Sequence, residues 1–357
     1  MDVAEVHMIS VIVPAHNAEK TIEACLRALQ QQTGIEDLAY EIILVNDGST
    51  DNTAVLAKKA GVRVISSQTK KGPASARNAG IRAAKGEITC FTDADCIPRP
   101  NWLQEITAPL LANPDIAGCK GAYCCEQTEI IARFVQIEYE NKYDILRRHS
   151  YITFMDFYSA AYRRQILVEN HGFDERFTAA NNEDRELSYR LADRGYKMVF
   201  QPTALVCHFH ANSFTGYVRK KVQNGFWTVP AVRHFPARAK DDSYTPQVQK
   251  VQIALIALIL LTAAPGLFFP PLLFLAGVLL LIFFMTTIPF TRKAWKKDRT
   301  IALFSPFLLA VSALALGIGF AWGWMRPLPP KPEHEDSADP TLSFLSTEHT
   351  DFTDFTA

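Results

Sequence analysis

Two carboxylates, Asp93 and Asp95, stand one residue apart in the stretch CFTDADCIP, directly after the apolar run ITCF. Acidic residues are poor strand formers, so an acid pair where a strand ends indicates either a chemical task or a turn. A third acid, Asp47, follows the apolar run EIILVN in the same way. Carboxylates that converge repel one another unless a cation neutralises them, and a divalent ion with oxygen ligands is the usual solution. The spacing therefore fits a metal site with positions open for a diphosphate, with a simple loop as the alternative.

The segments around these acids alternate short β-rich runs with helical patterns. The strand-like runs are ISVIVPA, YEIILVND, VRVISS and EITCFTDAD, and the helix-like runs are residues 18–32, STDNTAVLAKKAG and PASARNAGIRAAKG. This alternation predicts an α/β fold in which helices cover a parallel sheet. Ligands of such sheets bind beyond the carboxyl ends of the strands. We therefore expect Asp47, Asp93 and Asp95 to converge on one edge.

Four ordered segments resemble family 2 glycosyltransferases, which have a GT-A fold. They are ISVIVPAHNAEKTIEACLRALQQQT, EIILVNDGSTDNT, KGPASARNAGIRAAKGEITCFTDADCIPRPNWL and NNEDRELSYRLADRGYKMVF, and the resemblance covers about residues 9–235. It implies a Rossmann-like mixed sheet and a nucleotide-sugar donor, most commonly a UDP-sugar. It also implies a divalent cation, Mn²⁺ or Mg²⁺, and inversion at the anomeric carbon by direct displacement.

The resemblance assigns roles to individual residues. Asp47, in the NDGSTD loop, would contact the nucleotide base, and Arg77, in SARNAG, would lie near the nucleotide. Asp93 would face the ribose, and Asp95 would hold the metal. The residues implied in cofactor binding are Pro14, Ala15, Asn17, Asp47, Arg77 and Asp93, and those implied in metal binding are Asp95, Asp93 and His208.

The predicted chemistry also requires a base, because an acceptor hydroxyl is a weak nucleophile until its proton is removed. The resemblance assigns this role to Asp184 in NNEDREL, at the start of a helix that continues through LSYRLADRG. Helix N-termini favour negative charge, so Glu183 and Asp184 could alternatively be caps. The two roles are compatible, and Asp184 is the predicted catalytic base.

Two histidines, His208 and His210, follow the apolar run ALVC and would face the same way on a strand. Some enzymes of the GT-A class add a histidine to the metal shell after the base motif, which favours His208. The alternative for both histidines is a structural or solvent-facing position.

Composition limits the possible partners and compartments. The 37 basic residues balance 37 acidic ones, so nothing in the overall charge indicates nucleic acid. The seven cysteines all lie at or before Cys207, their number is odd and no C-x-x-C spacing occurs, so zinc is unsupported. We interpret them as small apolar filler in a reducing compartment.

The C-terminal third carries long uncharged runs that predict a membrane region over residues 251–325. Residues 251–290 contain Pro265, Pro270 and Pro271 but no charge, and a further uncharged run covers residues 301–324. Since about 20 helical residues cross a bilayer, we predict three transmembrane helices at about 251–269, 271–290 and 301–324.

The predicted loop between the second and third membrane helices, TRKAWKKDRT, has five basic residues against Asp298, a net charge of +4. Short basic loops stay in the cytoplasm, so the N-terminal portion, two crossings earlier, is expected there too. MDVAEVHMIS has no basic start, so no signal peptide is expected. Three crossings would place the tail, residues 326–357, outside. Its seven acidic and two basic residues predict disorder.

The stretch FTGYVRKKVQNGFW predicts a basic amphipathic helix at about residues 214–230, which could lie on the anionic cytoplasmic leaflet. Gln223 and Trp227 match the Gln-x-x-Arg-Trp signature of processive polysaccharide synthases, but Phe226 replaces its arginine. The predicted organisation is therefore a glycosyltransferase domain at residues 1–235, a linker at 236–250, the membrane helices and the tail.

The preferred function is transfer of one sugar to a membrane-associated, lipid-linked or glycan acceptor at the cytoplasmic face. Processive polymer synthesis is an alternative. A nucleotidyltransferase would usually carry a Gly-rich loop near the first strand, which VPAHNAEKT lacks. A non-catalytic membrane scaffold would not require the four acids Asp47, Asp93, Asp95 and Asp184 together.

Overall fold

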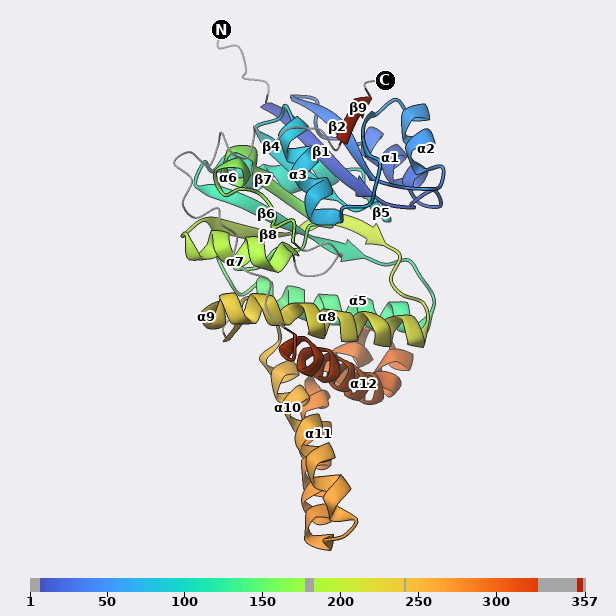
Figure 1. Cartoon of the computed structure of the whole chain (residues 1–357), viewed down its shortest axis with the longest axis vertical. Helices are drawn as coiled ribbons and strands as arrows, with labels where there is room; N and C mark the ends of the chain where they lie inside the picture. The colour runs from blue at the N-terminus through green and yellow to red at the C-terminus, as the bar shows by residue number, and fades with distance from the viewer. Residues whose placement is uncertain (1–6, 177–182, 241, 327–351, 356–357) are drawn as a thin grey trace. The chain divides into compact units, whose positions relative to one another are not determined.

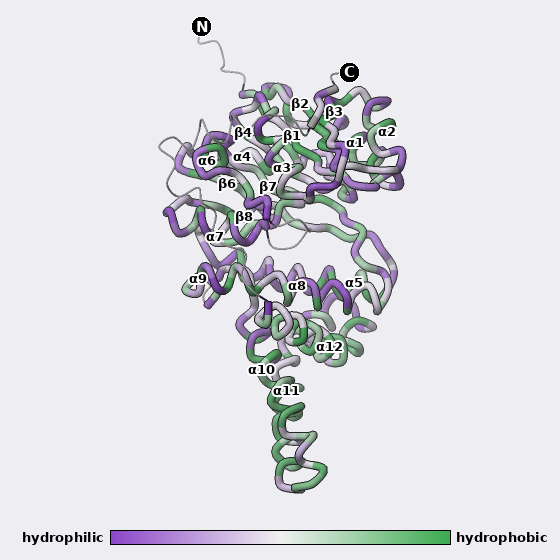
Figure 2. The backbone as a smooth tube through the Cα atoms, in the orientation of Figure 1, coloured by the Kyte–Doolittle hydropathy of each residue, from purple (hydrophilic) through white to green (hydrophobic). Residues whose placement is uncertain are grey.

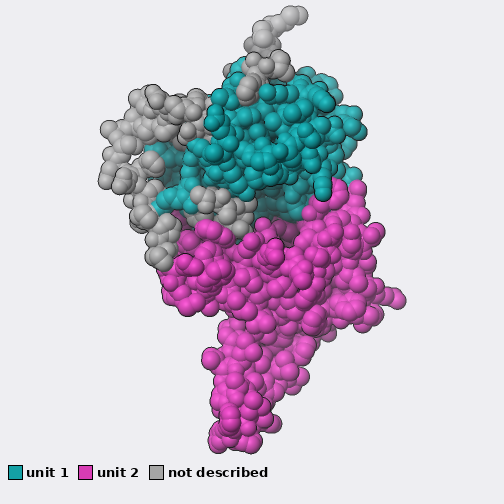
Figure 3. Space-filling view, turned by 45° about the vertical axis from the view of Figure 1, so that its right-hand side comes forward, with its two compact units in different colours: residues 1–124, 149–208, 329–357 teal, residues 125–148, 209–328 magenta. Residues whose placement is uncertain are grey.

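The computed structural model describes residues 7–176, 183–240, 242–326 and 352–355 (Figure 1). Apolar residues line the strands of the sheet and nearly the whole length of helices α10 (Gln247–Gly266) and α11 (Pro270–Lys297) (Figure 2). The chain divides into two compact units (Figure 3). The first comprises residues 1–124, 149–208 and 329–357, and the second comprises residues 125–148 and 209–328.

One mixed sheet forms the centre of the first unit. The order of its nine described strands is β5-β8-β6-β7-β4-β1-β2-β3-β9. Their bounds are β1 (His7–Ala15), β2 (Leu38–Asp47), β3 (Arg63–Ser67), β4 (Ile88–Thr92), β5 (Cys96–Pro98), β6 (Ile116–Cys124), β7 (Ser159–Arg163), β8 (Lys197–His208) and β9 (Phe352–Phe355). The pairs β1/β2, β1/β4, β2/β3 and β6/β8 are parallel, and β4/β7, β6/β7, β5/β8 and β3/β9 are antiparallel. The predicted α/β fold with a mixed sheet is confirmed.

Strand β1 lies in the interior of this sheet, between β2 and β4. Its residues Ile9, Val11, Ile12 and Val13 are fully buried. A strand covered on both faces is apolar at successive positions rather than at alternate ones, which accounts for the run ISVIV. The described helices of this unit are α1 (Ile22–Gln30), α2 (Thr53–Lys59), α3 (Pro73–Ala83), α4 (Trp102–Ala112), α6 (Arg164–Glu169) and α7 (Glu183–Asp193).

Helix α3 approaches the sheet closely because its inner face is made of small residues. Ala74, Ala76 and Ala79 are fully buried, and a Cβ atom on Gly80 would lie 2.4 Å from Ile12 Cγ2. The helix starts at Pro73, whose fixed φ suits a first helical position. This packing fixes the side chains that α3 sends toward the carboxyl end of the sheet.

The second unit is helical in its described residues. It contains α5 (Ile130–Leu146), α8 (Phe214–His234), α9 (Pro236–Lys240), α10, α11 and α12 (Arg299–Trp324). Helices α10, α11 and α12 are each long and apolar enough to cross a membrane. The predicted basic loop at residues 291–300 is wrong, because α11 continues to Lys297. Only Asp298 separates it from α12, and this residue caps α12 by accepting a hydrogen bond from the Ile301 N–H at 3.1 Å.

The end of the predicted disordered tail is ordered. Strand β9 pairs antiparallel with β3, and Asp354 accepts a hydrogen bond from Arg63 Nε at 3.0 Å. Residues 327–351 lie outside the described residues. A strand lies on the same side of a membrane as the sheet to which it belongs, so this pairing argues against the predicted placement of the tail and the N-terminal domain on opposite sides, and that placement stays an untested prediction.

Candidate active site

The carboxyl end of β2 is tied to the loop that precedes α3. Asp47, the last residue of β2, is buried, and its carboxylate accepts hydrogen bonds from the N–H groups of Lys71 at 2.6 Å and Gly72 at 2.8 Å. Gly72 has a φ of +98°, which favours glycine. Asp47 therefore holds the start of α3 against the end of its own strand.

The neighbouring strand β1 ends at Pro14 and Ala15, which lie beside Val45 and Asn46 of β2. Asn17 follows with a φ of +51°, and its Oδ1 accepts a hydrogen bond from the Thr50 N–H at 2.9 Å. The structure therefore brings the predicted residues Pro14, Ala15, Asn17 and Asp47 to one edge of the sheet. Their contact with a nucleotide stays a prediction.

Arg77 is the cation of this edge. Its buried guanidinium donates from Nη1 to Glu183 Oε1 at 2.6 Å and from Nη2 to Asp93 Oδ1 at 3.1 Å. The same group lies 5.7 Å from the ring centre of Phe157 and 5.5 Å from that of Phe173. Burial alone would lower the pKa of Arg77, but the two carboxylates raise it. Arg77 thus joins the acid pair after β4 to the start of α7.

Asp95 and His208 come from distant parts of the sequence. Strand β5 pairs antiparallel with β8 so that Cys96 lies opposite His208. This register brings half-exposed Asp95 beside the ring, with 3.4 Å between Asp95 Oδ2 and His208 Nε2. Burial would raise the pKa of Asp95, but the histidine holds it below its usual value. The pKa of Asp93 is raised, chiefly by burial and against the effect of Arg77.

Asp95, Cys96 and His208 have ligand atoms that all lie within 4.8 Å of one another. Burial raises the pKa of the Cys96 thiol well above its usual value, so this side chain stays protonated and is a poor ligand. A carboxylate and an imidazole remain, with Asp93 two residues from Asp95. Carboxylate oxygens suit Mn²⁺ or Mg²⁺, and an added imidazole suits a transition metal. The residues present therefore fit a divalent cation, with Mn²⁺ as the better match.

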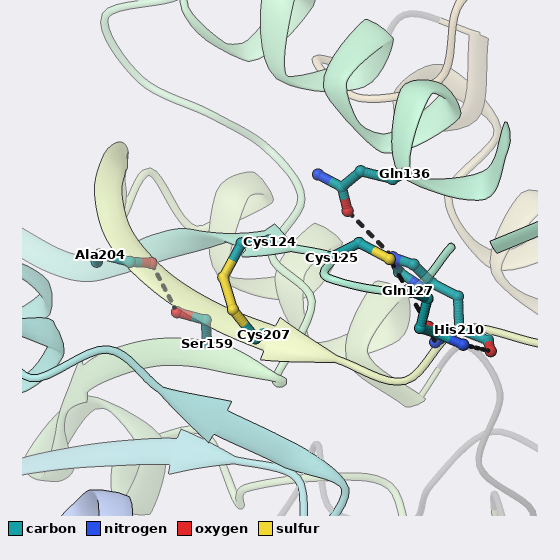
Figure 4. The surroundings of a disulfide bond; sticks show 8 residues. All are labelled: Cys124, Cys125, Gln127, Gln136, Ser159, Ala204, Cys207 and His210. Carbon is teal, nitrogen blue, oxygen red and sulfur yellow. Dashed lines mark hydrogen bonds between the residues drawn. A yellow bond between two sulfur atoms is a disulfide. The ribbon is translucent and has the colours of Figure 1, made fainter. Parts of the chain in front are cut away.

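The other predicted histidine is engaged elsewhere. His210 belongs to the second unit, where its Nε2 lies 3.1 Å from Gln136 Oε1 and its carbonyl accepts a hydrogen bond from Gln127 at 3.0 Å (Figure 4). Of the two candidates, it is His208 that lies beside an acid of the predicted site.

A disulfide lies directly before His208. Cys124 of β6 and Cys207 of β8 face each other in the strand register and are bonded (Figure 4). The interpretation of all cysteines as apolar filler is therefore wrong for this pair, although Cys25, Cys90, Cys96 and Cys119 are buried. The neighbouring residue of β6, Tyr123, places its ring 4.7 Å from the His208 ring, centre to centre. The end of β8 is thus fixed to β6 at the predicted metal ligand.

Asp184 is the second residue of α7, and its Oδ1 accepts a hydrogen bond from the Arg185 N–H at 2.7 Å. Burial, and then the charges of Glu183 and Asp156, raise the pKa of Asp184 to about 8. A carboxyl group with this pKa is suited to taking a proton near neutral pH. The capping position and a role as base are therefore compatible, although residues 181–182 of the motif lie outside the described residues.

Sequence reasoning missed a buried ion pair close to Asp184. Lys120 of β6 is fully buried and donates to Asp156 Oδ2 at 2.7 Å and to the Tyr158 hydroxyl at 3.0 Å. Burial lowers the pKa of Lys120, and the charge of Asp184 opposes this effect. The charge of Asp156 in turn helps to raise the pKa of Asp184. A lysine in the otherwise apolar and small run IAGCKGAY was the available signal, because a buried lysine requires a partner.

The mixed sheet, with these acids, Arg77 and a histidine at one edge, has the architecture of the GT-A fold. Residues 10–170, a little under half of the chain, match the family described as "Glycosyl transferase family 2", and long apolar helices lie at the C-terminal side of the matched part.

Individual relatives agree with this assignment. The chain is 26% identical over 238 residues to the "Pre-mycofactocin glycosyltransferase" of Mycobacterium tuberculosis, covering 63% of this chain and 48% of that protein. It is 24% identical over 234 residues to the "Glycosyltransferase AglE" of Haloferax volcanii, covering 61% and 71%. The match therefore spans about half the length of the first of these curated relatives.

A solved structure has a similar fold over most of the chain. The mannosyltransferase PcManGT from Pyrobaculum calidifontis, described in complex with GDP-Man and Mn²⁺, superposes with a TM-score of 0.56 at 19% identity. The similarity covers 89% of this chain and 88% of the other. At 19% identity this similarity establishes the fold alone.

Proposed function

We propose that this protein transfers a sugar from a nucleotide-sugar donor to a membrane-associated acceptor, a lipid-linked molecule or a glycan, with inversion at the anomeric carbon. The observation that carries the proposal is the meeting of Asp95 and His208, from opposite halves of the catalytic sequence, at the carboxyl edge of the sheet. Such a pair of donors beyond strand ends suits a site for a metal and a diphosphate.

Each site residue has a role in this proposal. Asp47, with Pro14, Ala15 and Asn17, forms the pocket edge for the nucleotide base, while Arg77 orients Asp93 toward the ribose. Asp95, Asp93 and His208 would hold the divalent cation, which supplies positive charge to the departing diphosphate. The relative with a similar fold is described with GDP-Man and Mn²⁺, so guanosine donors are candidates beside uridine donors.

Asp184 is the proposed base. As the acceptor oxygen bonds to the anomeric carbon, Asp184 takes the hydroxyl proton, and the electron pair of the breaking carbon–oxygen bond leaves with the nucleoside diphosphate. Its pKa of about 8 supports this role, because a stronger carboxylate base accepts a proton more readily. The Lys120–Asp156 pair is proposed to position this acid by charge without contacting the sugar.

The catalytic unit is proposed to lie in the cytoplasm on the basis of flanking charge, although its Cys124–Cys207 disulfide is a feature more typical of oxidising compartments. Arg292, Lys293, Lys296 and Lys297 lie in the last two turns of α11, and basic residues that flank membrane helices favour the cytoplasmic side. An acceptor carried by the membrane would then meet the donor at the surface of the cytoplasmic leaflet.

The proposal is tested with the purified full chain in lipid vesicles that contain a lipid extract as acceptor source. UDP- and GDP-sugars with labelled sugar groups are supplied with Mn²⁺, with Mg²⁺ or with a chelator, and released nucleoside diphosphate and labelled lipid are measured. We expect metal-dependent release and transfer for at least one donor. Product length separates single transfer from polymer synthesis. Formation of a nucleotidyl product, or no release from any donor, would overturn the assignment.

A further inference from the structure

Helix α8 has too much charge to cross a membrane. Arg219, Lys220 and Gln223 are exposed on it, and Lys221 pairs with Glu138 of α5 at 2.9 Å. Charged side chains within a spanning helix are costly and rarely face lipid. Helix α8 therefore lies at the membrane surface or above it.

Helix α12 lies alongside α8 (Figure 1), with contacts from Phe307 to its last residue. Near the beginning, the rings of Phe214 and Phe307 stack with centres 6.2 Å apart. At the other end, Arg233 donates a hydrogen bond to the Trp324 carbonyl. The Arg233 guanidinium also lies 4.3 Å from the centre of the Trp324 ring. Two helices in contact at both ends have the same depth in the membrane.

The contact between these helices is backbone to backbone. A Cβ atom on Gly319 would lie 2.0 Å from the Val222 carbonyl oxygen, and one on Gly225 would lie 2.3 Å from that of Leu316. Further along, a Cβ atom on Gly323 would lie 2.5 Å from the Phe226 carbonyl oxygen. Small residues allow such close approach, so α12 cannot leave the plane of α8 without losing this interface.

Most exposed side chains of α12 form one stripe. Large apolar residues are exposed at Leu303, Phe304, Phe307, Leu314, Ile318 and Trp322, at intervals that return to one helix face, and only Trp324, the last residue of the helix, is exposed on another side. By contrast, three successive residues of α11, Leu280, Leu281 and Ile282, are all exposed, and they point in different directions. The described hairpin of α10 and α11 presents apolar side chains around its circumference, whereas α12 presents them along one side.

The opposite face of α12 is apolar for a different reason. Ile301, Ala302 and Leu308 pack in a core with Phe134 of α5 and Phe290 of α11. A helix that is apolar toward protein on one side and toward lipid on the other has the mean hydropathy of a membrane span. Length and composition therefore identify α12 as a candidate crossing without distinguishing the two environments.

The chain end adds a separate constraint. Strand β9 belongs to the sheet of the catalytic unit, so the chain must return to the side from which it entered the membrane. Three crossings cannot satisfy this condition, but two can.

We infer that α10 and α11 form a two-crossing hairpin and that α12 lies in the plane of the membrane surface, with its stripe against the lipid acyl chains. The partner of this surface is the bilayer of the leaflet that faces the catalytic unit. The C-terminus is then on the catalytic side. Only the name of that side, the cytoplasm, rests on the proposed function.

The test uses three single reporters in the full chain with Cys125→Ser, since the other four free cysteines are buried. Phe268→Cys lies in the turn between α10 and α11, Lys296→Cys lies at the end of α11, and Thr353→Cys lies in β9. A membrane-impermeant maleimide is applied to intact and to permeabilised cells. We expect Phe268→Cys to react in intact cells and the other two only after permeabilisation.

The outcomes separate the inference from the proposed orientation. If Thr353→Cys is labelled under the same conditions as Phe268→Cys, and Lys296→Cys is not, then α12 crosses the membrane and the inference is overturned. If all three reporters behave alike, the hairpin does not cross, which also overturns it. If the pattern is inverted but Lys296→Cys and Thr353→Cys still agree, the inference stands and the cytoplasmic placement fails.

A depth test complements the labelling. Leu281→Lys places a charge in the middle of α11, and Leu314→Lys places one on the exposed stripe of α12, with Leu314→Gln as a neutral control of similar size. We expect Leu281→Lys to reduce membrane-inserted protein by at least about tenfold and Leu314→Lys to stay within about twofold, because a lysine at the surface reaches water. Normal levels of Leu314→Gln with loss of Leu314→Lys would place α12 in the hydrocarbon and overturn the inference.

Discussion

The carboxyl edge of the sheet and the α8–α12 pair stabilise close approach by opposite means. At the sheet edge, buried charges are held by partners, as where Arg77 bridges Asp93 and Glu183. Between α8 and α12, backbones touch because Gly225, Gly319 and Gly323 have no side chains. We therefore expect that removing a charge at the sheet edge changes activity while the sheet stays folded. Adding side-chain volume between α8 and α12 should instead disrupt the packing of these two helices.

The largest effect is expected at the acid beside His208. Asp95→Asn keeps the shape of the side chain but removes the charge that would attract a divalent cation, so metal-dependent transfer should fall by at least about a thousandfold. Initial rates over a range of Mn²⁺ concentrations measure this. Asp115→Asn, at an exposed acid of the same unit, is the control. Near-normal rates for Asp95→Asn at ordinary metal concentration would refute the metal assignment.

The next effect concerns the proposed base. Asp184→Asn should leave donor binding nearly intact and reduce transfer by at least about a hundredfold, because asparagine can cap α7 but cannot accept the proton. Calorimetric titration with nucleoside diphosphate and metal, beside initial rates, tests both parts. If binding is lost together with rate, Asp184 belongs to the donor site or to the structural support.

The pH dependence sharpens the same point. Because burial and neighbouring acids raise the pKa of Asp184 to about 8, the group is mostly protonated at pH 7 and becomes a base as the pH rises. We expect kcat/KM to rise about tenfold per pH unit below this pKa and to level off above it. The profile is measured at saturating metal. A profile that is flat between pH 6 and pH 8 would contradict the assignment.

For the packed region, Gly319→Val is the direct test. Its new Cβ atom would meet the Val222 carbonyl oxygen, so we expect a loss of about 1–3 kcal/mol in folding stability and a lower yield of inserted protein. Gly277→Val in α11 is the matched control, since no atom lies within 4 Å of the added Cβ position. Equal yields of the two variants in membrane fractions would show that the α8–α12 contact is dispensable.

The smallest effect is expected at the β3–β9 edge. A double-mutant cycle of Arg63→Gln and Asp354→Asn, followed by thermal unfolding in detergent, should give a coupling of about 0.2–1 kcal/mol, because the pair is partly exposed and screened. The coupling should decrease at high salt. A coupling of zero at low salt would mean that this pair does not help to hold β9.

Local sequence signals place the three acids at the sheet edge, whereas contacts that depend on strand register have no local signal, and only the family resemblance pointed to His208. Asp47, Asp93 and Asp95 follow apolar strands, so the turn from strand to loop places them at the edge of the sheet. The approach of Asp95 to His208 depends on the pairing of β5 with β8, which are about a hundred residues apart. Neither short-range periodicity nor composition encodes that pairing.

The same limit applies to Cys207 and Lys120. The disulfide partner of Cys207 is set by the register between β6 and β8, and the partner of Lys120, Asp156, lies in an irregular segment before β7. For α12, hydropathy cannot distinguish a residue that packs against protein from one that packs against lipid. Leu308 against protein and Phe307 against lipid contribute alike to hydropathy, so the pattern indicates an apolar helix without indicating its orientation.

The position of β9 has a consequence for synthesis of the protein. Strand β3 leaves the ribosome roughly 290 residues before its partner β9, so the edge of β3 stays open for roughly 15–60 s at a translation rate of about 5–20 residues per second. An open strand edge can recruit other chains, and a charge on it opposes such pairing. Arg63 would therefore protect the nascent sheet from aggregation until Asp354 arrives and neutralises it.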